Sequence, residues 1–400
     1  MKIGILIAEL VPYGAERIAI RLAQGLKKHG VGVTILLTDR SQSMEVKDIS
    51  VIPMLHGSGG LSLIQKLLYA PLQYIRLYRA IKKEKIDILI SFMERANIFS
   101  VILKGKFRRI PTIHDFLSRS LKERPSLFHK LAPHVFYRLF KKRPDLWVCV
   151  SKAASTDFAK TFNIDPDRVK TMYNPLDLDR ATSLAREPLE DKYRDLLKGN
   201  SILHVGRIDK QKGHWYLLRA FSRVLETLPD AKLILLGDGE LRDYAESLAN
   251  DLGIKEKVHF LGIHDNPFKF MLRASVFVLN SLWEGLPTVL VEALSCKAAI
   301  VAADCKSGPR ELLAPDTDFS RTAQRVEQSE YGILIPPFDG EFKDADAPLT
   351  KEESMLAEAL LLLLQDNSLR ERYKQVSCQR IDAFRTERII EEWMDVFKNL

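Results

Sequence analysis

The sequence predicts an α/β protein with two doubly wound, Rossmann-like domains, each a parallel sheet covered by helices on both faces. Short apolar runs alternate with amphipathic helical patterns along most of the chain, as is typical of strands connected by helices. The 400 residues, 46% of them hydrophobic, are more than one core usually organises. The alternation breaks near residues 173–199 and then starts again, which predicts a second domain after the first.

We expect the first domain to span residues 1–180. Apolar runs predict its strands at 3–8, 31–37, 86–91, 110–114 and 146–150. Helical patterns lie between them at 15–29, 61–83, 95–104, 121–140 and 153–161.

We expect the second domain to span residues 181–385, and the last segment, 386–400, to pack back on the first domain. The predicted strands lie at 201–205, 233–236, 258–261, 276–279, 299–303 and 332–335. An acidic, Pro-containing loop at 341–349 precedes two closing helices at 351–365 and 368–384. The two sheets are expected to face each other across a shared cleft, because open α/β sheets bind ligands beyond the carboxyl ends of their strands.

The apolar runs and the cysteines exclude several classes of protein. The opening residues 1–8 fit a buried strand better than a signal peptide, and the longest apolar stretches are too short to cross a bilayer. The cysteines at 149, 296, 305 and 378 lack metal-ligand spacing, which favours free thiols in a reducing compartment. We therefore expect a cytoplasmic protein, with the inner face of the cytoplasmic membrane as the alternative location.

Charge is divided unevenly between the predicted domains. Residues 1–180 hold 31 Lys and Arg against 16 Asp and Glu, whereas the remainder holds 29 against 36. The first 180 residues are therefore expected to bind an anionic partner, such as a lipid surface or a phosphorylated acceptor. Nucleic acid is the least favoured partner, because the basic residues lack a recognised motif with interleaved aromatic residues.

The basic charge is densest in residues 104–143, which hold 12 Lys and Arg residues. Within this segment, apolar residues from Leu127 to Phe140 recur near helical spacing beside basic ones. Such a helix can lie on an anionic membrane surface, or it can face the core and leave its other side to solvent. The sequence favours neither alternative, although Pro133 argues against one straight membrane helix.

The strongest local motif is Gly206-Arg207-Ile208-Asp209-Lys210-Gln211-Lys212-Gly213, directly after a predicted strand and before a helix. Arg207 and Lys212 place two cations near a helix N-terminus, where an anion is stabilised by both the side chains and the helix end. The motif predicts a diphosphate site, and the alternative is a solvated basic turn.

A second motif is Glu284-Gly285-Leu286-Pro287-Thr288-Val289-Leu290-Val291-Glu292. Pro287 suits the first turn of a helix, so Glu284 is expected in the loop and Glu292 on the helix. A carboxylate buried on that apolar helix needs a partner, which the hydroxyls of a ribose would supply. The alternatives are a capping role for Glu284 and a structural ion pair for Glu292.

Together these two motifs resemble the donor site of the family 4 glycosyltransferases, which are retaining enzymes of the GT-B fold. The resemblance extends over nearly the whole chain. It also includes Gly14-Ala15-Glu16-Arg17, Thr112-Ile113-His114, Val150-Ser151-Lys152, Tyr173-Asn174-Pro175 and Leu236-Gly237-Asp238-Gly239.

The resemblance implies a role for each matching residue. Arg207 and Lys212 would hold the donor diphosphate, Glu292 the ribose, and Glu284 the transferred sugar. The residues expected to contribute mainly backbone contacts are Gly14 (phosphate), Gly262, Ile263 and His264 (base), and Gly285, Leu286, Pro287 and Thr288 (sugar and its phosphate). Similar enzymes often have two glycines where this chain has Tyr13-Gly14.

His114, at a strand end of the first domain, matches a histidine that similar enzymes place near the sugar. The resemblance implies that it orients the sugar or the acceptor hydroxyl. The segment Ser307-Gly308-Pro309-Arg310-Glu311 is a further candidate for contact with the donor.

The implied reaction transfers a hexose or N-acetylhexosamine from a nucleoside-diphosphate sugar, with UDP favoured, to a glycan or lipid-linked acceptor. The resemblance implies attack on the same face of the sugar that the diphosphate leaves, with Arg207, Lys212, Glu284 and His114 at the reacting centre. We expect no essential metal, because the Asp-x-Asp triplets at 165–167, 177–179 and 344–346 fall where capping or solvated roles are expected. A nucleotide-sugar epimerase and a non-catalytic nucleotide-sugar-binding subunit are the alternatives.

Overall fold

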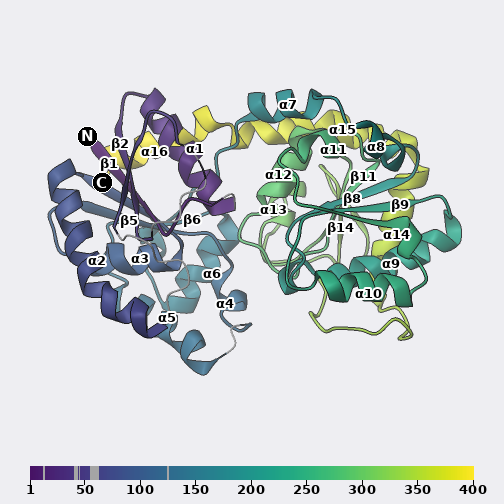
Figure 1. Ribbon diagram of the computed structural model, residues 1–400, viewed down its shortest axis with the longest axis horizontal. Helices are drawn as coiled ribbons and strands as arrows, with labels where there is room; N and C mark the ends of the chain where they lie inside the picture. The colour runs from purple at the N-terminus through teal and green to yellow at the C-terminus, as the bar shows by residue number, and fades with distance from the viewer. Residues whose placement is uncertain (12–13, 40–43, 45, 55–62, 124–125) are drawn as a thin grey trace. The chain divides into compact units, whose positions relative to one another are not determined.

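The computed structural model describes residues 1–11, 14–39, 44, 46–54, 63–123 and 126–400 (Figure 1). They form two compact units: Met1–Leu176 with Phe384–Leu400, and Asp177–Ala383. Each unit is built on a sheet of seven strands with helices around it. The prediction of two doubly wound α/β domains is confirmed.

The first sheet has the strand order β3-β2-β1-β4-β5-β6-β7, and its neighbouring strands are parallel. Its strands are β1 (Lys2–Ile7), β2 (Gly32–Leu37), β3 (Ser50–Pro53), β4 (Ile88–Phe92), β5 (Arg108–Ile113), β6 (Trp147–Cys149) and β7 (Val169–Thr171). The two edge strands, β3 and β7, were not predicted, because both are short and have no fully buried run of residues.

Helices cover both faces of this sheet. They are α1 (Gly14–Lys28), α2 (Leu63–Glu84), α3 (Met93–Ile102), α4 (Leu117–Ser120), α5 (Leu127–Phe140), α6 (Lys152–Phe162) and α16 (Thr386–Lys398). The C-terminal helix α16 packs beside α1 in this unit, where Ile389, Ile390 and Trp393 join the same apolar cluster as β1 (Figure 1). Gly25 of α1 permits this approach, since a Cβ there would lie 2.6 Å from the Ile390 side chain.

The second sheet has the order β10-β9-β8-β11-β12-β14-β13, with β13 antiparallel to β14. Its strands are β8 (Ser201–Val205), β9 (Lys232–Leu236), β10 (Val258–Gly262), β11 (Val276–Leu279), β12 (Ile300–Ala303), β13 (Glu327–Gln328) and β14 (Ile333–Ile335). Its helices are α7 (Leu178–Arg186), α8 (Asp191–Arg194), α9 (His214–Thr227), α10 (Arg242–Asp251), α11 (Phe268–Met271), α12 (Thr288–Ser295), α13 (Pro309–Leu313), α14 (Lys351–Gln365) and α15 (Asn367–Ile381).

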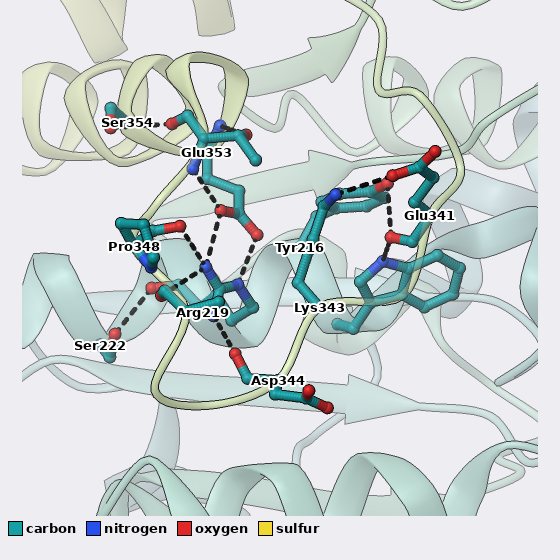
Figure 2. Close-up of polar contacts among 12 residues, drawn as sticks. Tyr216, Arg219, Ser222, Glu341, Lys343, Asp344, Pro348, Glu353 and Ser354 are labelled. Atoms are coloured by element: carbon teal, nitrogen blue, oxygen red, sulfur yellow. Dashed lines mark hydrogen bonds and ion pairs between the residues drawn. The ribbon is translucent and has the colours of Figure 1, made fainter.

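A fully buried ion pair joins α9 to the first turn of α14 (Figure 2). The Arg219 guanidinium donates to both carboxylate oxygens of Glu353, at 2.7 and 3.2 Å, and also to the carbonyls of Asp344, Ala347 and Pro348. The segment at 341–349 has no regular secondary structure, as predicted, yet these bonds tie its backbone down. Because α9 begins at His214, directly after Lys212-Gly213, this clamp also fixes the helix that follows the first motif.

Candidate functional site

The two motifs flank the point where the strand order of the second sheet reverses. In that sheet β8 lies between β9 and β11, and the chain runs outward from β8 in both directions. The first motif follows β8 and the second follows β11. Open α/β sheets bind ligands in the crevice at such a reversal, so the topology gathers the motifs at the favoured position.

Glycines bring the loops after β8 and β9 into backbone contact. Gly237 has φ +140°, and a Cβ at this position would lie 1.9 Å from the Gly206 carbonyl oxygen. Two backbone hydrogen bonds join the same loops, Gly206 N to Leu236 O at 2.9 Å and Ile208 N to Asp238 O at 3.0 Å. The first motif is therefore held on its β9 side by a contact that only glycine allows.

Lys212 and Glu284 form the centre of the site and contact each other directly. The Lys212 Nζ lies 2.5 Å from Glu284 Oε1, and their side chains are only 13% and 9% exposed. Lys212 closes a short turn, in which the Asp209 carboxylate accepts a hydrogen bond from the Lys212 backbone N–H at 3.2 Å. Two residues that the sequence assigned to different parts of a ligand therefore pair with each other in this structure.

Two polar residues that the sequence analysis missed also hold the Glu284 carboxylate. The Ser281 hydroxyl donates to Oε1 at 2.7 Å, and the Gln211 amide reaches Oε2 at 3.5 Å and the Trp283 carbonyl at 2.8 Å. Gln211 also accepts from Arg207 at 3.5 Å, so it links the two motifs. Ser281 could have been found from the sequence, because it follows an apolar strand where such loops meet ligands.

Arg207 is the exposed cation of the site. Its side chain is 62% exposed and lies 3.1 Å from the Asp209 carboxylate. Burial raises the pKa of Asp209, and the neighbouring cations Arg207 and Lys212 oppose that shift. Of the two cations assigned to the diphosphate, Arg207 is therefore accessible and Lys212 is enclosed.

The loop of the second motif is supported from beneath by Ser307 and Gly308. The Ser307 hydroxyl donates to the Gly285 carbonyl at 2.7 Å, and a Cβ on Gly308 would lie 2.3 Å from Pro287. Arg310, by contrast, pairs with Asp304 and Glu327, which are not part of this loop. The predicted candidate segment 307–311 therefore supports the loop in this structure.

Helix α12 begins at Thr288, with Pro287 as its N-cap and Gly285 and Leu286 in the preceding loop. Glu292 lies on this helix, as predicted. Its residue is only partly buried, whereas the sequence predicted a buried carboxylate. Val291 and Ala293 beside it are buried, so Glu292 lies where the helix turns from its buried side toward solvent.

The loop expected to receive the base follows β10. Gly262 has φ +74° and accepts a hydrogen bond from Gly237 N at 2.8 Å, which connects it to the glycine contact described above. Ile263 is 77% exposed. His264 packs edge-on against Tyr193 and Phe270, and burial lowers its pKa. This loop therefore offers an exposed apolar side chain about two strand spacings, roughly 10 Å, from β8.

Two buried histidines lie behind Lys212. The rings of His204 and His214 meet edge to face, with centroids 4.4 Å apart. Burial, together with a smaller effect of the nearby Lys212 charge, lowers the pKa of both groups, that of His214 to about 3. Both rings are therefore neutral at physiological pH and add no positive charge to the site.

In the first unit, Gly14 is the first residue of α1, the helix that follows β1, and the strand order reverses between β1 and β4. A Cβ on Gly14 would meet no atom within 4 Å, so a ligand can approach its backbone. Tyr13 lies outside the described residues.

His114 follows β5 and is held by a polar network inside the first unit. Its Nε2 lies 2.8 Å from Thr112 Oγ1, and the Thr112 hydroxyl donates to the Ser91 carbonyl at 2.8 Å. Since that hydroxyl has one proton, it must accept from His114, which places the ring proton on Nε2. Burial lowers the pKa of His114 to about 4, so the ring is neutral and Nδ1 keeps its lone pair.

The ring of His114 is turned toward the interior. It stacks on Phe92 at 5.0 Å, and Nδ1 is buried without a hydrogen-bond partner in the described part of the chain. The adjoining cavity, which Tyr173 and Asn174 also line, has a volume of about 10 Å³, roughly that of one water. A sugar could therefore reach Nδ1 only after the ring turns outward.

Two of the three Asp-x-Asp triplets have the predicted capping role. Asp165 accepts from the Asp167 backbone N–H, and Asp177 caps the start of α7 by accepting from Arg180 N. Among the described residues, no cluster of three or more His, Cys, Asp or Glu side chains could hold a metal ion. Each helix that the structure describes is too short or too polar to cross a membrane.

Two protein-family models match the chain. The model described as Glycosyltransferase Family 4 matches residues 12–180, and the model described as Glycosyl transferases group 1 matches residues 186–327.

Similar sequences and folds occur in glycosyltransferases. An uncharacterized glycosyltransferase of Methanocaldococcus jannaschii is 36% identical over 331 residues, which cover 80% of each chain. A Campylobacter jejuni enzyme, N-acetylgalactosamine-N,N'-diacetylbacillosaminyl-diphospho-undecaprenol 4-alpha-N-acetylgalactosaminyltransferase, is 30% identical and covers 96% of this chain and 95% of its own. The crystal structure of Anabaena HepE in complex with UDP-glucose shares the fold, with a TM-score of 0.75, 21% identity and full coverage of both chains.

Proposed function

Since the chain belongs to the family 4 glycosyltransferases and is a retaining glycosyltransferase of the GT-B fold, we propose that it transfers a hexose or N-acetylhexosamine from a UDP-sugar to a lipid-linked acceptor. The observation that carries this proposal is the meeting of Lys212 and Glu284 at the reversal of the second sheet. The reaction belongs to the assembly of envelope polysaccharide or glycan.

The relatives support the choice of donor and acceptor. The Campylobacter jejuni enzyme acts on a sugar linked to diphospho-undecaprenol, and an Escherichia coli relative, 26% identical over 308 residues, is a UDP-Gal:alpha-D-GlcNAc-diphosphoundecaprenol alpha-1,3-galactosyltransferase. A lipid diphosphate is also the kind of anion that suits the basic first 180 residues.

In the proposed complex, Arg207 and Lys212 stabilise the charge that develops on the leaving diphosphate. The backbone N–H groups at the start of α12 contact the phosphates, as helix N-termini do. In the first unit, we propose a phosphate contact for the Gly14 backbone. Glu284 and residues 285–288 contact the sugar, Glu292 binds the ribose, and the loop at 262–264 receives the base. His114 turns outward and accepts a hydrogen bond from a sugar or acceptor hydroxyl through Nδ1.

Two separate measurements test this proposal, one of donor binding and one of sugar transfer. UDP-, GDP- and ADP-sugars are screened for protection against thermal unfolding, and we expect UDP-sugars to raise the melting temperature. Release of UDP is then followed with and without a polyprenyl-diphosphate-linked sugar, and we expect it to depend on that acceptor. UDP release that is independent of the acceptor, or protection by none of the sugar nucleotides, would contradict the proposal.

The cations of the site are tested by Lys212→Met and Arg207→Gln. We expect each to lower kcat/KM by roughly 100-fold or more, because each removes a charge that faces the leaving group. Arg223→Gln is the matched control, since Arg223 is an exposed residue of α9 paired with Glu226. A loss no larger than that of the control would place the diphosphate elsewhere.

We further propose that helix α5 docks the enzyme on an anionic membrane, at the inner face of the cytoplasmic membrane. One side of α5 faces the core, where Tyr137 packs edge-on against Trp147 and Phe158. The other side exposes Leu131, Val135 and Leu139 at helical spacing, with exposed fractions of 51%, 55% and 73%. The side chains of Leu127 and Phe128 lie outside the described part of the structure.

The exposed stripe of α5 is accompanied by basic residues. Exposed basic residues here include Arg138 of α5, Lys142 and Arg143 just after its end, and Lys104 and Lys106 in the loop between α3 and β5. Arg143 donates to the Leu103 carbonyl at 3.3 Å, so the end of α5 and this loop share one edge of the unit. A helix face with apolar side chains between basic ones can bind an anionic bilayer. Each basic residue near the surface contributes about 1 kcal/mol to the free energy of binding.

The membrane proposal is tested by sedimentation with vesicles of phosphatidylglycerol and phosphatidylcholine. Replacing Val135 and Leu139 by Ser, or Arg138 and Lys142 by Gln, should each lower the bound fraction. These changes remove apolar area or charge from the outward face of α5 and from the residues just after its end. Leu272→Ser, which changes an exposed leucine of the second unit, is the control. Equal binding by all variants would remove the membrane from the proposal.

A further inference from the structure

We propose that Glu284 makes the site discriminate between a sugar nucleotide and the bare nucleoside diphosphate that remains after transfer. This inference rests on the proposed function and adds a specificity role at the same site. It starts from the contact between Lys212 and Glu284, because a cation suited to a diphosphate already has an internal anion beside it.

The Glu284 carboxylate is well satisfied by the protein itself. Oε1 receives Lys212 Nζ at 2.5 Å and the Ser281 hydroxyl at 2.7 Å, and Oε2 faces the Gln211 amide at 3.5 Å. The surrounding loop is fixed as well, since Glu284 N donates to Lys306 O and Ser307 N donates to Glu284 O. The carboxylate therefore has little freedom to leave when a ligand arrives.

A diphosphate that binds Lys212 brings a second anion to the same ammonium. Glu284 is only 9% exposed, so water screens the repulsion between its carboxylate and the phosphate poorly. The hydrogen bond from Lys212 to the carboxylate also weakens, so the carboxylate needs another hydrogen-bond donor. Ser281 and Gln211 already donate to it, so the new donor must come from the ligand.

A sugar nucleotide can supply this donor, whereas a nucleoside diphosphate cannot. Sugar hydroxyls next to the diphosphate can donate to Glu284 and offset the repulsion. After transfer the sugar is gone, and the terminal phosphate of the product carries more negative charge. Glu284 then disfavours the product complex, which lowers product affinity relative to the donor and favours release.

A purely structural ion pair makes a different prediction. If Glu284 only held Lys212 in place, its removal would displace the ammonium and weaken both ligands alike. If Glu284 also opposes the anion, its neutralisation should strengthen UDP binding while it weakens the binding of the sugar nucleotide. The ratio of the two dissociation constants distinguishes these roles.

The test compares Glu284→Gln with the wild-type chain by calorimetric titration of UDP and of UDP-N-acetylgalactosamine. We expect the Kd for UDP to fall, the Kd for the sugar nucleotide to rise, and their ratio to change by about tenfold or more. Glu226→Gln is the matched control, because it neutralises an exposed carboxylate of the same unit that pairs with Arg223. Circular dichroism checks that each variant is folded.

A second variant covers the case in which Glu284→Gln does not fold. Glu284→Asp keeps the charge but withdraws it from Lys212 by one methylene, and we expect it to shift the ratio in the same direction by a smaller amount. A parallel weakening of both ligands, or an unchanged ratio, overturns this inference alone. If wild-type protein binds neither UDP nor any UDP-sugar, the proposed function falls, and this inference falls with it.

Discussion

Replacing Arg219 by Met should destabilise the second unit more than any surface change, because it leaves a buried carboxylate without its cation. Arg219 and Glu353 are both fully buried, and in the variant Glu353 keeps the hydrogen bond from Thr350 N at 2.7 Å but loses its ion pair. The carbonyls of Asp344, Ala347 and Pro348 lose their donor as well. Breaking a buried pair from one side typically costs about 3–5 kcal/mol.

The opposite change should cost less. In Glu353→Gln the Arg219 guanidinium keeps three backbone carbonyls as acceptors, so we expect a loss of about 1–3 kcal/mol. The double variant Arg219→Met with Glu353→Leu leaves no unpaired charge and should recover part of the loss. The structure thus predicts an order among three variants at one site.

Urea unfolding followed by circular dichroism measures this order, with the midpoint of the transition compared among the variants. Because α9 begins directly after Gly213, we also expect Arg219→Met to weaken donor binding at temperatures at which the protein is still folded. The reasoning is refuted if Arg219→Met costs less than about 1 kcal/mol, or if Glu353→Gln is the more damaging of the two.

Three further predictions concern the glycine contact, the buried histidines and the link between the motifs. Gly237→Ala should lower both the free energy of unfolding and donor affinity, because its Cβ would lie 1.9 Å from the Gly206 carbonyl oxygen. Gly253→Ala is the control, because a Cβ there meets no atom within 4 Å, and it should cost only about 1 kcal/mol in thermal unfolding. The pKa of His214 is lowered to about 3 in the folded protein, whereas it is near 6.5 in the unfolded chain. Neutral His214 therefore contributes stability above pH 6.5, and this contribution is lost as the pH falls toward 3. In a plot of melting temperature against pH, His214→Phe should flatten this range. Gln211→Leu should reduce kcat more than thermal stability, since it removes the amide that joins Arg207 to Glu284; an effect on stability alone would make it structural.

The sequence determined the architecture because its signals were local and repeated. Buried strands such as β1 and β9 are largely apolar runs, and each is followed by an amphipathic helix, so periodicity alone predicted the two doubly wound units. The edge strands β3 and β13 escaped notice because they are short and partly exposed. A strand held at a sheet edge by one neighbour needs no apolar pattern on both faces.

The motifs likewise placed the candidate residues at the right loops, but only the tertiary structure decided what those residues contact. Lys212 and Glu284 are 72 positions apart, and the sequence assigned them to different parts of a ligand; the strand order brings them to 2.5 Å. The inward turn of His114 and the partial exposure of Glu292 depend on neighbours from other elements, such as Phe92 beside the histidine. Periodicity and residue type are properties of short segments and can be read along the chain, whereas the partner of a side chain is set by which distant strands become neighbours.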